Sequence, residues 1–142
     1  KQGNSNLVAV HPDTLEVLDS LALPEPATVP HVVTLFEDRI AIGDYLFVHA
    51  GIRPDVPLEQ QRVSDLRWIR GAFLDHDESF GYTVVHGHTI TELPEVRHNR
   101  IGIDTGAFAS GRLTALGLEG EARWLIEAQD TGEGIAVTHR RI

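Results

Sequence analysis

Hydrophobic and polar positions alternate over short runs along most of the chain, which is the pattern of half-buried β-strands. Turn-forming residues separate these runs, as at His11-Pro12-Asp13 and Gly43-Asp44. The runs predict strands at residues 7–10, 16–18, 32–36, 39–42, 45–48, 83–85, 100–103, 113–118 and 122–126. We therefore expect a protein rich in sheet, with hairpins and sandwich-like layers.

A helical pattern is confined to the middle of the chain. Pro57 suits the first position of a helix ahead of residues 58–61. Ser64 suits the N-cap of a second helix over residues 65–76. Four apolar residues of that segment share one face, namely Leu66, Ile69, Phe73 and Leu74. With one or two short helices beside many strands, the predicted fold class is α+β and mostly β.

Length and composition favour one domain. A chain of 142 residues with 42% hydrophobic content can build one core and is too short for two ordinary domains. Its character changes near Ile42-Gly43. The stretches NLVAVHPDTLEVLDSLALP and VVTLFEDRIAI, within residues 1–42, predict antiparallel hairpins and weakly resemble a blade fragment of a β-propeller. Residues 121–142 are expected to form a C-terminal strand and tail.

The charge balance and the apolar runs exclude several classes of partner. The chain carries 21 acidic and 12 basic residues, a net charge of −9, and Lys1 is its only lysine, so nucleic acid is not an expected ligand. No apolar run approaches the roughly 20 residues that span a bilayer, so we expect no membrane partner and a cytoplasmic location by default. Because cysteine is absent, a metal site must use His, Asp, Glu or Asn.

The first candidate for chemistry is His49. It ends the apolar run of the phrase YLFVHAGIRP, and small residues follow it. A strand that ends in this way presents an imidazole at the edge of a sheet, with room beside it for a ligand or a metal. The competing interpretation is a hydrogen-bonded structural histidine, which is the commoner use of such a residue.

A second candidate is the pair His86 and His88 in the phrase TVVHGHT. In extended geometry both imidazoles point to one face, whereas a turn at Gly87 would rotate them apart. Metal binding and simple hydrogen bonding at a strand end are both open for this pair. Asp104, in the phrase IGIDTGA, ends a further strand, and an Asp in such a position usually stabilises its own turn.

Arg67 and Arg70 lie three residues apart on the second predicted helix, where they would share a face. Arginine holds phosphate through paired N–H donors. The alternative is a solvated helix face, which the spacing alone favours.

The order of the phrases is more specific than any one of them. FVHAGIRP, LRWIRGAF, VHGHT and IGIDTGAFASGRLTALGLEG together resemble the C-terminal half of bacterial and phage Ser/Thr protein phosphatases of the calcineurin-like metallophosphoesterase superfamily. The resemblance covers residues 43–120. It implies that His49 and His88 are ligands of one ion in a two-metal centre of manganese, iron or zinc. It also implies that Arg70 binds the substrate phosphate.

Within this resemblance, His86 and Asp104 are not family metal ligands, although His86 stays a possible additional ligand on the residues alone. The family's remaining ligands come from Asp-x-His, Gly-Asp-x-x-Asp-Arg-Gly and Gly-Asn-His-Glu phrases, and none of them occurs in residues 1–44. Two-metal hydrolysis needs one ion to activate water while both hold the phosphoryl oxygens. Two imidazoles alone would hold manganese weakly, and zinc, nickel or copper more firmly.

Three interpretations follow. We favour an incomplete metallophosphatase-derived module without phosphatase activity, arising as a recombined, truncated or engineered fusion. The first alternative is a metal-dependent phosphoester hydrolase that a missing segment or a partner completes, which would then act on a phosphorylated substrate. The second alternative is a β-rich interaction protein. Because half of the family's sandwich would leave apolar strand faces and open edges uncovered, we also expect a homo-oligomer.

Overall fold

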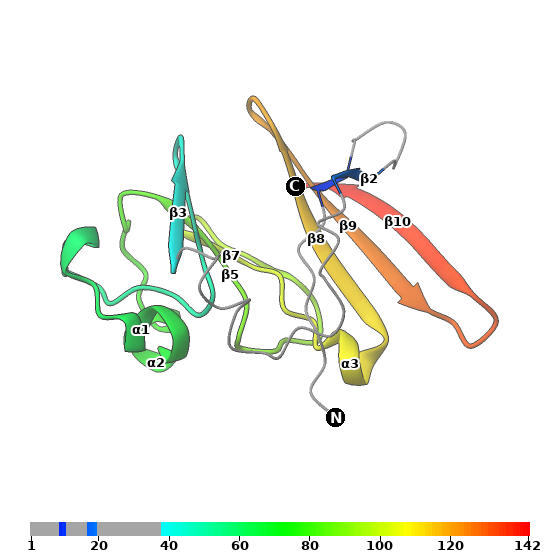
Figure 1. Ribbon diagram of the computed structural model, residues 1–142, viewed down its shortest axis with the longest axis horizontal. Coiled ribbons are helices and arrows are strands. Elements are labelled where there is room, and N and C mark those ends of the chain that lie inside the picture. Colours follow the sequence, from blue (N-terminus) through cyan, green and yellow to red (C-terminus); the bar gives the residue numbers. More distant parts are fainter. Residues whose placement is uncertain (1–8, 11–16, 20–37) are drawn as a thin grey trace. The chain divides into compact units, whose positions relative to one another are not determined.

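The computed structural model describes residues 9–10, 17–19 and 38–142 (Figure 1). The chain divides into two units, Lys1–Glu37 and Asp38–Ile142. In the first unit, β1 (Ala9–Val10) pairs antiparallel with β2 (Val17–Asp19). Both strands fall on predicted runs. The strand predicted at residues 32–36 lies outside the described residues.

A five-stranded sheet forms one part of the second unit. Its strand order is β3-β4-β5-β7-β6, and β4, β5 and β7 run parallel to one another. β3 pairs antiparallel with β4 across a turn in which Gly43 has a φ of 56°, and β6 pairs antiparallel with β7. The bounds are β3 Arg39–Ile42, β4 Tyr45–Val48, β5 Thr83–His86, β6 Glu95–Val96 and β7 Arg100–Gly102. The parallel strands bring their carboxyl ends to one edge.

The helical segment is interrupted. Instead of one helix over residues 65–76, the chain forms α1 (Val63–Trp68) and α2 (Gly71–Leu74), because Ile69 between them is extended with a ψ of 145°. The N-cap of α1 is Arg62, so the prediction that Ser64 caps the helix is wrong. A 3-10 turn, η2 (Leu58–Gln60), follows Pro57 as expected. No helix within the described part of the chain is long and apolar enough to cross a membrane.

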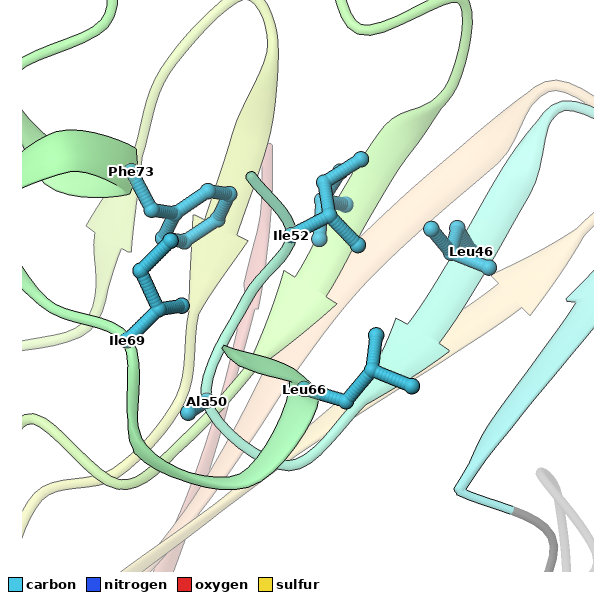
Figure 2. Packing of buried hydrophobic residues seen from close by; sticks show 7 residues of the cluster. Leu46, Ala50, Ile52, Leu66, Ile69 and Phe73 are labelled. Carbon is cyan, nitrogen blue, oxygen red and sulfur yellow. The ribbon is translucent and has the colours of Figure 1, made fainter. Parts of the chain in front are cut away.

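The core lies between β4, β5 and the helical segment (Figure 2). Leu66, Ile69 and Phe73 are all buried, which confirms the apolar face predicted from the sequence. The Phe73 ring lies so close to Gly51 that a Cβ on this glycine would fall 2.4 Å from a ring carbon. The buried cluster consists of Leu46, Ala50, Ile52, Leu66, Ile69, Phe73 and Val84.

A second, three-stranded sheet follows along the chain. It has the order β10-β9-β8, formed by β8 (Arg112–Glu119), β9 (Ala122–Asp130) and β10 (Ile135–Arg141). A short helix, α3 (Ala107–Ser110), precedes β8. The sequence predicted shortened versions of β8 and β9 but neither α3 nor β10. β10 was missed because four of its seven residues are polar, Thr138, His139, Arg140 and Arg141, so apolar alternation does not extend past Val137.

Together these elements form an α+β fold that is mostly β, as predicted.

The position of Leu46 at the centre of the buried cluster generates the first prediction. Leu46 is fully buried on β4, so we expect Leu46→Ala to lower the free energy of unfolding by about 2–5 kcal/mol through lost burial and a residual cavity. Leu93→Ala is the control, because Leu93 is 61% exposed and its truncation should change stability by less than about 0.5 kcal/mol. Urea unfolding followed by circular dichroism measures both. Equal losses in the two variants would contradict this placement of the core.

Candidate functional site

His49 and His88 lie side by side at the carboxyl ends of two neighbouring parallel strands. Their ring centroids are 5.0 Å apart and the rings are inclined by 56°. The N–H of Gly87 donates to the carbonyl oxygen of His49 at 2.9 Å, which ties the segment after β5 to the segment after β4. His49 is exposed and His88 is half-buried. The structure therefore brings together the two histidines that the sequence singled out in separate phrases.

His86 points elsewhere. His88, two residues further along the chain, has a φ of 64°, so the chain leaves extended geometry and the two imidazoles separate. The His86 ring is buried edge-on to Phe73, with centroids 4.9 Å apart, and its Nδ1 donates to the carbonyl oxygen of Gly87 at 3.2 Å. Burial lowers the pKa of His86 and keeps it neutral. His86 thus belongs to the core beneath the site and does not join the pair.

Arg70 extends the site. One Nη1–H of its guanidinium donates to the Thr89 hydroxyl at 2.9 Å, which holds the arginine beside the turn that carries His88. The pKa of His88 is lowered by burial first and by the positive charge of Arg70 second. Arg67, in contrast, donates through Nε to a carboxylate oxygen of Asp38 at 2.7 Å. Because α1 ends at Trp68, Arg67 and Arg70 have separate partners instead of the shared helix face that the sequence predicted.

Two further residues border the pair and were not singled out by sequence reasoning. Trp68 is 69% exposed, and its ring meets that of His88 edge-on with centroids 5.4 Å apart. Thr89 anchors Arg70. Their position in the sequence could have identified them, because Trp68 follows Arg67 in the phrase RWIR and Thr89 follows His88 in the phrase HGHT.

Asp104 lies close enough to the pair for its charge to act on His88, whose lowered pKa it tends to raise. Its Oδ1 accepts the N–H of Gly106 at 3.0 Å, which is the turn-stabilising role expected from the sequence. Within residues 9–10, 17–19 and 38–142, no group of three or more His, Cys, Asp or Glu side chains is placed to hold a metal ion. The two imidazoles of His49 and His88 would therefore supply only two ligands, and any others would come from water or from another molecule.

Comparison with protein-family models, with curated proteins and with solved structures found no match to this chain. The phosphatase resemblance and the propeller resemblance therefore stay predictions that rest on the sequence phrases.

The electrostatic link between Arg70 and His88 generates the second prediction. In metal-free protein we expect Arg70→Gln to raise the pKa of His88, because the substitution removes a positive charge that disfavours the imidazolium. NMR titration of the imidazole signals measures this pKa. Arg140→Gln is a matched control on the exposed strand β10, and its charge does not contribute to the lowered pKa of His88. An unchanged or lower pKa in Arg70→Gln would contradict the arrangement.

Proposed function

We propose that the unit Asp38–Ile142 is half of a metallophosphoesterase site, able to bind a divalent ion weakly and unable to hydrolyse phosphoesters by itself. The observation that carries the proposal is the approach of His49 and His88 to a ring separation of 5.0 Å beside Arg70. Three residues from three separate phrases converge on one place, and they are the three to which the family resemblance assigns metal and phosphate binding.

Metal binding is the first step of the proposal. Imidazole nitrogens suit zinc, nickel and copper better than manganese. A metal competes with protons for an imidazole, so the lowered pKa of His88 favours the neutral, metal-binding form near neutral pH. With two ligands from the chain, the affinity should be modest.

Phosphate binding is the second step and depends on the first. Arg70 donates one N–H to Thr89, and other N–H groups of its guanidinium could donate to an anion. The net charge of −9 opposes a phosphate elsewhere on the chain, and Arg67 is already paired with Asp38. A bound cation between His49 and His88 would add the missing positive charge, so phosphate affinity should increase when the metal is present.

Hydrolysis requires more than this half supplies. A two-metal mechanism needs ligands that bridge two ions and a base or ion that activates water. Among the described residues no third His, Cys, Asp or Glu side chain joins the histidine pair in a group that could hold a metal ion, and Asp104 uses one carboxylate oxygen to accept the Gly106 N–H. One observation favours the alternative of an enzyme completed by another segment or chain. Trp68 leaves 69% of its surface exposed beside His88, and a second half would cover it.

The third prediction tests metal binding. Zinc should raise the melting temperature of the full chain, because an ion that binds only the folded form stabilises it by about 2.7 kcal/mol at a free concentration 100 times its Kd. His49→Ala and His88→Ala should each abolish the increase, and His98→Ala, at an exposed histidine outside the pair, should retain it. Differential scanning calorimetry measures the shift. If millimolar zinc leaves the melting curve unchanged, or if the increase survives in both variants, the half-site proposal fails.

The fourth prediction concerns catalysis. With added manganese or zinc, the purified chain should hydrolyse p-nitrophenyl phosphate no faster than buffer that contains the same metal. Wild type, His49→Ala and Arg70→Ala should therefore give the same rate. A turnover that persists through purification and disappears in both variants would instead show that a complete site assembles, and would favour the enzyme alternative.

A further inference from the structure

β10 (Ile135–Arg141) is an outer strand of its sheet. For each of its residues, the side to which the backbone N–H and C=O groups point can be assigned. The N–H of Thr131 donates to the carbonyl oxygen of Gly134, and the N–H of Ile142 donates to that of Arg123, both at 2.9 Å. Bonded pairs alternate with non-bonded pairs in an antiparallel ladder. The register then assigns the bonds with β9 to every second residue, namely Ala136, Thr138 and Arg140.

The intervening residues direct their N–H and C=O groups away from β9. These are Ile135, Val137, His139 and Arg141. Their side chains share one face of the sheet. On that face Val137 lies opposite Ala128, which lies opposite Leu113, so an apolar row crosses the sheet as far as this edge. Val137 is 48% exposed and Leu113 is 63% exposed.

Natural edge strands are protected by being short or bulged, by charged residues or proline, or by a covering helix or loop. β10 runs for seven residues in regular register with β9 and contains no proline. Its two arginines, Arg140 and Arg141, lie at its C-terminal end, so the stretch 135–138 carries no charged side chain. The outer strands of the five-stranded sheet are shorter, since β3 and β6 have four and two residues. β8, the other outer strand of the β10 sheet, has eight residues, and the Thr105 hydroxyl donates to the carbonyl oxygen of the first of them, Arg112.

We propose that β10 pairs antiparallel with β10 of a second copy of this chain, about a two-fold axis at Val137, to form a continuous six-stranded sheet. Val137 then faces the partner's Val137, and Ile135 faces the partner's His139. The outward N–H and C=O groups of all three residues gain partners. The apolar row of each copy continues into that of the other through the paired valines.

Charge favours this register over two others that the backbone polarity allows. With the axis at Val137, Arg141 comes level with the partner's Glu133, which belongs to the turn before β10, and the symmetry makes this pair twice. Moving the axis to Thr138 places Arg141 opposite the partner's Ile135, and moving it to Arg140 places two arginines directly opposite one another. Edge pairing buries less than the roughly 1,600 Å² of a standard interface, so the dimer should be weak and dependent on concentration.

Sedimentation velocity of the full chain over a wide concentration range tests the proposal. We expect a monomer–dimer equilibrium in wild type and a largely monomeric Val137→Pro variant. Proline removes the N–H that faces outward at the axis and leaves the bonds to β9 intact, because those belong to the flanking residues. Val137→Thr is the matched control, because it keeps the backbone donor and should still dimerise. Melting curves report whether each variant folds.

A charge exchange keeps the test decisive if Val137→Pro unfolds. Glu133→Arg alone and Arg141→Glu alone should each weaken dimerisation by at least about tenfold, and the double variant should restore it. A wild type that stays monomeric at every concentration would overturn the proposal. The same holds if the chain is monomeric and residues 1–37 protect the β10 amides from hydrogen exchange. A dimer that is indifferent to Val137→Pro, or that the double exchange fails to rescue, would also overturn it.

Discussion

The parallel pairing of β4, β5 and β7 is the constraint on which the candidate site depends. Each of these strands is followed by a small-residue turn, and parallel pairing places the turns at one edge. The Gly87 N–H closes the gap by donating to the His49 carbonyl oxygen. An antiparallel neighbour in place of β5 would have directed His88 to the opposite edge, and the two imidazoles would have lain apart.

A buried arginine links the helical segment to the sheet that carries the site. Arg100 on β7 is almost fully buried, donates to the carbonyl oxygen of Leu74 at 2.6 Å and lies 3.4 Å from a carboxylate oxygen of Glu95. Its guanidinium also lies 5.8 Å from the centre of the Phe73 ring. A buried charge is tolerated only with such partners, and removing one of them is strongly destabilising. Arg100 therefore connects α2 to the sheet, and the His86 ring meets the same phenylalanine ring edge-on.

The candidate site and the β10 edge illustrate two kinds of incompleteness. In the proposed half-site, the histidine pair would provide two ligands where a metal needs four or more, and Trp68 is exposed beside it. At the edge, backbone donors and acceptors are presented without a neighbouring strand among the described residues. The proposed half-site needs ligands of another chemical kind, whereas the β10 edge can pair with an identical strand. A second copy can therefore complete the sheet without completing the site.

The sequence by itself determined the class of fold and the local elements with apolar alternation. β3 and β4 begin and end where the pattern predicted, because the side-chain period of a strand is a local property of the chain. Leu66, Ile69 and Phe73 are buried as predicted, although they lie on α1, on the extended link and on α2 instead of on one helix. The sequence also supplied the histidines and Arg70 as candidates, through phrases that are specific only in combination. Tertiary structure alone decided which of them meet. The left-handed backbone of His88 separated it from His86, the extended Ile69 ended α1 and separated Arg70 from Arg67, and strand pairing brought His49 to His88. These outcomes depend on contacts between segments far apart in the chain, so no local pattern contains them.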